Sequence, residues 1–201
     1  NSENADAIAR GELEERDAPN ERFIVRASGV QHRYVIEKTG VLDPKRLRPH
    51  LPPRGEDEDS IQCEIPLVAI REALKEVGRQ PEDVDAVIVA CSNLQRAYPA
   101  VAVENQSALG AGGWAYDMNV ACSSATFGLQ AAVDAVRCGS ARCVAVVSPE
   151  ITSAHNNFEL RDYHFIFGDA CTAVIVEADD EESPRPGWEV LGTRLQTLYS
   201  N

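Results

Sequence analysis

Cys122 occupies a position at which a cysteine can work as a nucleophile. It follows residues 114–120, an apolar segment that predicts a short strand, and it precedes apolar residues with helical spacing at 129, 132, 133 and 136. A thiol at the first turn of a helix faces free N–H groups with partial positive charge, which favour the thiolate. Small neighbours such as Ala121 and Ser123 leave room for a substrate. The pattern indicates covalent chemistry through sulfur. The alternative is a structural cysteine, because free thiols also pack in cores.

The spacing of the cysteines gives little support for a metal site or a redox disulfide. The 201 residues include six of them, namely Cys63, Cys91, Cys122, Cys138, Cys143 and Cys171. No two form a C-x-x-C pair, so a zinc or redox motif has little support and we expect no bound metal. Most lie in apolar segments, which is typical of a reducing compartment, and we predict a cytoplasmic protein.

The elements that must position Cys122 alternate between strands and helices. Residues 84–90 form a continuous apolar run, typical of a strand that is covered on both faces. Apolar spacing predicts helices over residues 61–77 and 101–109. We expect further strands at 142–148, 171–177 and 188–195, a strand or extended passage at 23–34, and a loop at 149–166. This order predicts an α/β fold with a mostly parallel central sheet.

Charge and hydropathy exclude some classes of partner. The formal net charge of −13 argues against nucleic acid, which is bound by basic surfaces. No run approaches the ~20 apolar residues that a membrane span needs, so we expect no membrane partner. Residues 35–60 are rich in charge and proline and predict an exposed insertion. An acidic protein partner would need a local basic patch, which the basic residues between Arg22 and Arg48 can supply.

Several segments, taken in order, resemble one protein family. They are residues 23–30 (FIVRASGV), 84–93, 98–100 (YPA), 117–129 (DMNVACSSATFGL) and 166–170 (IFGDA). Together they resemble the β-ketoacyl-acyl carrier protein synthase III enzymes, which are condensing enzymes of the thiolase-like superfamily. The pairing of the cysteine turn with the later Phe-Gly-Asp turn is the most specific part of the resemblance.

The resemblance implies a thiolase-like fold. Residues 1–201 would be the N-terminal half of its duplicated αβαβα architecture, with the first strand of the fold preceding Asn1. The catalytic His and Asn of the family would lie in a C-terminal half beyond Asn201. We therefore expect the active site to be completed by that half.

The resemblance also implies a chemical activity, that of a 3-oxoacyl-acyl-carrier-protein synthase III in fatty-acid synthesis. Cys122 would take an acyl group from an acyl-CoA primer, and the acyl-cysteine would condense with malonyl-acyl carrier protein. Acyl-CoA would be a substrate, and no cofactor would stay bound. The long insertion favours a medium-chain primer over acetyl-CoA.

Coenzyme A contacts are implied for Phe23, Arg26 and Arg161, although relatives commonly carry tryptophan where this chain has Phe23. A guanidinium can pair with phosphate or stack on a base. The alternative for Arg161 is an ordinary surface arginine.

An acyl pocket is implied for Tyr98, Ile166 and Phe167. In the family, the residue at the position of Tyr98 reaches into the neighbouring subunit, so we expect a homodimer. The alternatives are a loop aromatic for Tyr98 and core residues for the other two. Asp117 and Asp169 are expected to act structurally, through hydrogen bonds.

Two other hypotheses stay open. A thiolase or a hydroxymethylglutaryl-CoA synthase would share the fold and the cysteine. A non-catalytic partner subunit would use a half-fold of this kind to scaffold or cap an active homologue.

Overall fold

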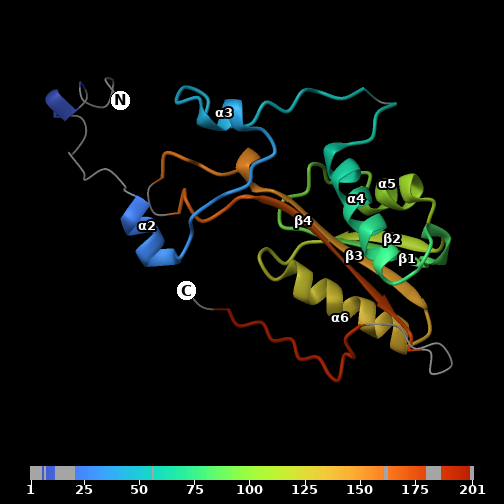
Figure 1. Cartoon of the computed structure of the whole chain (residues 1–201). Helices are drawn as coiled ribbons and strands as arrows, with labels where there is room; N and C mark the ends of the chain where they lie inside the picture. Colours follow the sequence, from blue (N-terminus) through green and yellow to red (C-terminus); the bar gives the residue numbers. More distant parts are fainter. Residues whose placement is uncertain are drawn as a thin grey trace. The chain divides into compact units, whose positions relative to one another are not determined.

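A four-stranded sheet organises the larger of the two units into which the chain divides. The structure is a computed structural model that describes residues 6, 8–11, 21–55, 57–160, 163–179 and 187–199. One unit comprises Asn1–Arg33 and Asn157–Phe167, and the other comprises Tyr34–Asn156 and Gly168–Asn201. The sheet belongs to the second unit and has the strand order β2-β1-β3-β4 (Figure 1).

The sheet is mostly parallel, as predicted. Its strands are β1 Ala86–Ala90, β2 Trp114–Met118, β3 Cys143–Ile151 and β4 Asp169–Glu177. β1 pairs in parallel with both β2 and β3, and β4 runs antiparallel to β3. The carboxyl ends of β1, β2 and β3 therefore meet at one edge, and Cys122 follows β2 at that edge.

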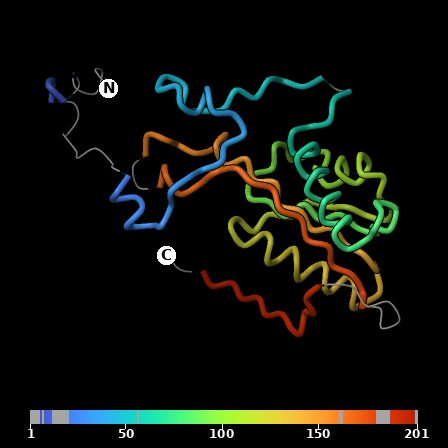
Figure 2. Tube along the Cα trace, viewed as in Figure 1, coloured from blue at the N-terminus to red at the C-terminus, as the bar shows by residue number. Residues whose placement is uncertain are grey.

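Helices cover both faces of the sheet. α4 (Ile61–Glu76) and α5 (Val101–Leu109) lie on one face and α6 (Ser124–Arg137) on the other, as the ribbon and the tube both show (Figures 1 and 2). Val87 and Val89 of β1 pack in the core under α4 and α5, whereas Ala86, Ile88 and Ala90 pack under α6. Burial on both faces explains why this strand is apolar at every position.

A glycine turn sets the start of β2 against the start of β1. Gly113 has φ +67°, and a Cβ there would lie 1.8 Å from the carbonyl oxygen of Asp85. The next residue, Trp114, donates its N–H to the same oxygen over 3.2 Å. Only glycine allows this approach, and the register of β1 with β2 follows from it.

Shorter elements complete the described chain. They are α2 (Glu21–Ser28), α3 (Lys38–Leu42) and the 3₁₀ helices Pro81–Asp83 and Thr152–Ala154. α3 lies within the predicted insertion at residues 35–60, whose other described residues form loop. No helix among the described residues is long and apolar enough to cross a bilayer.

The strand or extended passage predicted at 23–34 is wrong over its first part, and the strand predicted at 188–195 is absent. Residues 21–28 form α2, in which Glu21 in the first turn and Arg26 in the last complement the helix dipole, whereas residues 29–34 form neither helix nor strand. Residues 187–199 contain no strand, although 188–195 was predicted as one. Trp188 and Leu191 there are 99% and 83% exposed, and the Val190 carbonyl accepts a hydrogen bond from Arg137 of α6 rather than from a strand.

The hairpin of β3 and β4 is longer than predicted, so the loop expected at 149–166 begins after Ile151. The predicted strand stopped at residue 148, directly before Pro149, and a proline cannot donate a hydrogen bond to a neighbouring strand. The pairing of β3 with β1, however, ends at Val147. Pro149 therefore lies beyond that ladder, and its missing N–H leaves no bond to β1 unmade.

Candidate active site

The turn between β2 and α6 presents Cys122 to solvent. β2 ends at Met118, α6 begins at Ser124, and the Cys122 thiol is exposed in the turn between them. Ala121 has φ +47°, in the left-handed region that a residue with a Cβ rarely adopts. A strained residue in a sharp strand-to-helix turn is the geometry that lifts a nucleophile above the end of a sheet.

Two side chains hold the strained residue in place. Asn119 accepts the Ala121 N–H over 2.9 Å and donates its own amide to the carbonyl of Ser92 over 2.9 Å. Ser124 is buried, accepts the N–H of Val120 over 2.9 Å and donates its hydroxyl to the Ala121 carbonyl over 2.7 Å. The peptide groups on both sides of Ala121 are therefore fixed, and Cys122 is attached to the second of them.

The same bonds fix the direction of the Cys122 N–H. The Ala121 carbonyl accepts from both the hydroxyl and the backbone N–H of Ser124, so it points into the start of α6. The N–H and C=O of a trans peptide point in opposite directions. The Cys122 N–H therefore points away from the helix, where it can donate to a negative oxygen that forms beside the thiol.

Close packing of α6 on the sheet fixes the position of the helix start, which follows the Cys122 turn directly. A Cβ at Gly128 would lie 2.8 Å from Ala90 Cβ, 3.0 Å from Val146 Cγ1 and 3.5 Å from Met118 Sδ. Those distances leave no room for a methyl group, so glycine allows α6 to lie directly on β1 and β3. Ser124 is one turn before Gly128, and the helix start is thus held against the sheet.

Burial separates Cys122 from most of the other thiols. Burial raises the pKa of Cys63, Cys91 and Cys171 to about 12 and that of Cys143 to about 11. These four stay protonated at neutral pH and act as small core side chains. The structural alternative for cysteine is correct for them, whereas the exposed thiol of Cys122 fits the nucleophile that the sequence predicted.

Cys138 is a second exposed thiol that sequence reasoning did not single out. Hydrogen bonding with Ser140 lowers the pKa of Cys138, and a serine two residues after a cysteine was the available signal. Cys138 caps the carboxyl end of α6, where the helix dipole disfavours an anion. Cys122 precedes the opposite, amino end of the same helix.

Asp117 and Asp169 are structural, as predicted. Asp117 accepts the N–H groups of Val101 (2.8 Å) and Ala102 (2.7 Å) and so caps α5. Asp169 accepts the Ile36 N–H over 2.8 Å and both the N–H and the hydroxyl of Ser153. Each carboxylate is occupied by donors from neighbouring segments of the unit.

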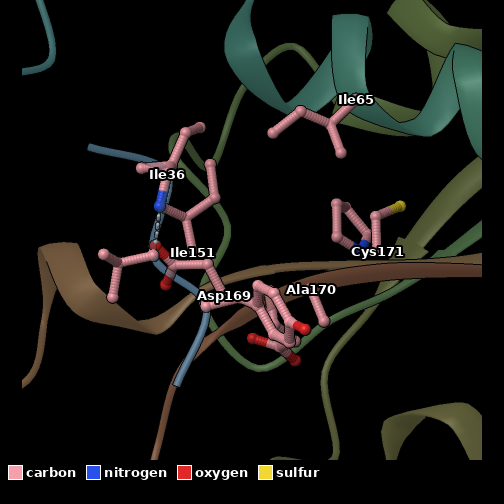
Figure 3. Close-up of a pocket in the computed structure, with 10 residues that line it drawn as sticks. Ile36, Ile65, Ile151, Asp169, Ala170 and Cys171 are labelled. Atoms are coloured by element: carbon pink, nitrogen blue, oxygen red, sulfur yellow. Dashed lines mark hydrogen bonds between the residues drawn. The ribbon is translucent and has the colours of Figure 1, made fainter. Parts of the chain in front are cut away.

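A small apolar cavity lies beside Asp169, with a volume of about 190 Å³ (Figure 3). Ile65 of α4, Ile36 and the strand residues Ile151, Ala170 and Cys171 line it, and the Ile36 N–H bonds to Asp169 at its rim. Its lining suits a short apolar group. No local pattern predicts this cavity, because its walls come from four separate segments.

The remaining predicted site residues are divided between the two units. Tyr98, which belongs to the unit of Cys122, is 88% exposed between β1 and α5. Phe23 and Arg26 lie on α2 in the other unit, where Phe23 is 60% exposed.

Ile166 and Phe167 belong to that other unit too, 46% and 41% exposed, while Arg161 lies outside the described residues. Their roles toward coenzyme A and the acyl chain stay predictions. His164 packs edge-on against Phe165, with ring centroids 5.4 Å apart.

One group of described side chains brings possible metal ligands together. Donor atoms of Asp59, Cys63 and Glu104 lie within 4.8 Å of one another. Glu104 already accepts hydrogen bonds from Ser60 and Arg96, and the raised pKa of Cys63 keeps its thiol protonated. These residues therefore fit a metal ion poorly.

Comparison with known proteins identifies related sequences. Residues 116–197 match the family model for 3-oxoacyl-[acyl-carrier-protein (ACP)] synthase III. The whole chain is 56% identical to a β-ketodecanoyl-[acyl-carrier-protein] synthase of Pseudomonas aeruginosa and spans 57% of its length. A β-ketoacyl-[acyl-carrier-protein] synthase III of Acidiphilium cryptum is 38% identical over 118 residues, which are 58% of this chain and 37% of that protein.

Solved structures agree with the sequence matches. The 3-oxoacyl-[acyl-carrier-protein] synthase III of Aquifex aeolicus is 26% identical, with a TM-score of 0.66 over 81% of this chain and 46% of that one. The corresponding enzyme of Pseudomonas aeruginosa is 25% identical, with a TM-score of 0.64 over 83% and 46%. The predicted thiolase-like α/β fold is confirmed, and so is the resemblance: the chain is related to the N-terminal part of the 3-oxoacyl-acyl-carrier-protein synthase III family.

Proposed function

We propose that this chain supplies the nucleophile of a 3-oxoacyl-acyl-carrier-protein synthase III, with Cys122 as the residue that carries the acyl group. The observation that carries the proposal is the exposed thiol in a braced strand-to-helix turn, within a segment that the family model matches. The chain spans about half the length of the relatives it matches, and the complete activity is therefore part of this proposal.

The first step is acyl transfer to sulfur. The Cys122 thiolate attacks the carbonyl carbon of acyl-CoA, a new carbon–sulfur bond forms, and the bond to coenzyme A breaks. The electron pair leaves with coenzyme A, which takes up a proton. Because the attacking and leaving groups are both thiolates, the exchange is close to balanced. The outward-pointing N–H of Cys122 is oriented to stabilise the oxyanion of the intermediate.

The second step is condensation. Malonyl-acyl carrier protein loses carbon dioxide, the carbanion attacks the acyl-cysteine carbonyl, and Cys122 leaves as thiolate. This step needs groups that stabilise the enolate of the thioester. In our proposal a His and an Asn of a C-terminal half supply them, as the family resemblance implies.

The name of one relative suggests the length of the primer. A β-ketodecanoyl product contains ten carbons, of which the malonyl group contributes two after decarboxylation. We therefore assign an eight-carbon acyl-CoA to this protein, in agreement with the medium-chain primer that the sequence favoured. Phe23, Arg26 and Arg161 would meet coenzyme A, and Ile166 and Phe167 would line the acyl pocket with Tyr98 of a homodimer partner.

The test is condensation by the full-length protein. With octanoyl-CoA and malonyl-acyl carrier protein, we expect a 3-oxodecanoyl product and one carbon dioxide released for each product. Cys122→Ser should abolish product formation, and Cys138→Ser, at the other exposed thiol, should leave it unchanged.

The alternatives give different results. Product formation from octanoyl-CoA with acetyl-CoA in place of malonyl-acyl carrier protein, a condensation that releases no carbon dioxide, would favour a thiolase or a hydroxymethylglutaryl-CoA synthase. A full-length protein that forms no product with any acyl-CoA, although it binds a homologous synthase, would favour a non-catalytic partner subunit.

A further inference from the structure

We propose that Glu150 is a positioning residue for Cys122, acting through Ser92 and Asn119. Glu150 lies in β3, whereas Cys122 follows β2 on the far side of β1. A chain of hydrogen bonds nevertheless links the two. The inference rests on the proposed function, because it assigns a role in acyl transfer to Cys122.

The first link joins β3 to the end of β1. Glu150 Oε1 accepts the Ser92 N–H and Oε2 accepts the Ser92 hydroxyl, each over 2.7 Å. The parallel ladder between these strands ends at Val89 and Val147, so it does not reach either residue. The carboxylate takes over where the ladder stops and holds the end of β1 in register with β3.

The second link joins β1 to the turn. The Ser92 carbonyl accepts the Asn119 amide over 2.9 Å, and Asn119 Oδ1 in turn accepts the Ala121 N–H over 2.9 Å. Ala121 is the strained residue directly before Cys122. Because the Ser92 carbonyl orients Asn119, its position determines whether that side chain can hold the φ +47° conformation.

A carboxylate suits this position for a chemical reason. Ser92 presents two donors at once, an N–H and an O–H, and a carboxylate can accept both. A glutamine would meet one of them with its own NH₂ donor, and an alanine would leave both unpaired. Glu150→Gln should therefore loosen Ser92 partly and Glu150→Ala should loosen it fully.

The chain offers a matched control at the other end of the sheet. Asp85 also bridges β1 and β3 with a carboxylate, accepting the N–H groups of Arg142 (2.7 Å) and Cys143 (3.1 Å). It lies seven residues before Ser92, or roughly 20 Å along an extended chain. Asp85→Ala should lower the free energy of unfolding as Glu150→Ala does, but it should leave the conformation of the Cys122 turn unchanged.

The experiment measures acylation of Cys122 in the full-length protein with octanoyl-CoA, in single turnovers followed by intact mass. For Glu150→Ala we expect the maximal acylation rate to fall about 10- to 100-fold, with half-saturation by octanoyl-CoA unchanged, since displacement of a reacting group slows chemistry rather than binding. Asn119→Ala should give a similar loss, and the double variant should be no slower than either single one, because both act through one chain. Glu150→Gln should give a smaller loss.

Hydrogen exchange supplies a readout that is independent of turnover. The Ala121 amide should exchange faster in Glu150→Ala than in wild type, and Asp85→Ala should leave both its exchange and the acylation rate within about twofold of wild type.

Each other result overturns the inference. Wild-type acylation in Glu150→Ala, multiplicative losses in the double variant, or an equal loss in Asp85→Ala would each refute the link while leaving the proposed function intact. A wild-type protein that acquires no acyl group would overturn the proposed function itself, and the inference with it.

Discussion

Gly128→Ala tests how tightly the sheet holds the start of α6. The new methyl carbon would lie 2.8 Å from Ala90 Cβ and 3.0 Å from Val146 Cγ1, against the ~3.5–4.0 Å at which carbon atoms pack well. Both contacts are with buried side chains, so neither can turn away into solvent. The helix must therefore move off the sheet by about half an ångström or more, and Ser124 at its first turn moves with it.

Two opposing terms set the magnitude of the effect. Overpacking a core costs about 1–3 kcal/mol. Alanine in place of glycine within a helix returns about 1 kcal/mol through helix propensity. We expect Gly128→Ala to lower the free energy of unfolding by about 1 kcal/mol, as measured by urea denaturation of the full-length protein.

A double variant provides the control. Ala90→Gly removes the methyl group that lies nearest to the new one, so Gly128→Ala combined with Ala90→Gly should be more stable than the two separate losses predict. If Gly128→Ala instead raised the free energy of unfolding, as at an unhindered helix position, α6 would not be seated on β1 and β3 as described. The bracing of the Cys122 turn would then need another explanation.

Three further predictions concern the surroundings of the site. Asp117→Ala should lower the free energy of unfolding by about 0.5–2 kcal/mol, because it removes the cap of α5. Asp117→Asn should lower it less. Equal stability of wild type and Asp117→Ala would contradict the capping role. The side-chain hydrogen bond from Thr39, followed by the backbone bond from His50, lowers the pKa of Glu37 from 4.5 to about 2, so its contribution to stability is present above pH 4.5 and is lost as the pH falls toward 2. The difference in unfolding free energy between wild type and Glu37→Gln should therefore shrink as the pH falls from 4.5 toward 2. A difference that stays constant with pH would contradict a stabilising role for the ionised Glu37. A maleimide at pH 8 should label Cys122 and Cys138 in the native protein, and the buried Cys63, Cys91 and Cys143 only after denaturation; rapid native labelling of any of these three thiols would contradict its burial.

Local sequence patterns predicted the elements around the site well. The apolar run at residues 84–90, the helix at 101–109 and the strand-to-helix change on either side of Cys122 all agree with the structure. These segments carry a single dominant signal, since burial on one or both faces fixes which positions must be apolar. The small residues around Cys122 predicted room for a substrate there, and the thiol is exposed in the turn.

Features that depend on distant segments could not be predicted. Residues 188–195 were predicted as a strand, but they pair with no strand in the described chain, and pairing depends on distant segments. For residues 23–34 a strand or an extended passage was predicted, and the helix at 21–28 was missed although its apolar residues gather on one side at helical spacing. The bond between Glu150 and Ser92 joins residues 58 apart, and neither residue stands out in its own segment.

The site of acylation tests the role of Cys122 most directly. The full-length protein is incubated with octanoyl-CoA alone, without malonyl-acyl carrier protein, and the modified peptide is mapped by mass spectrometry. We expect one octanoyl group per chain, bound to Cys122 as a hydroxylamine-sensitive thioester and missing in Cys122→Ser. An octanoyl group on Cys138, or equal acylation of Cys122→Ser, would contradict it.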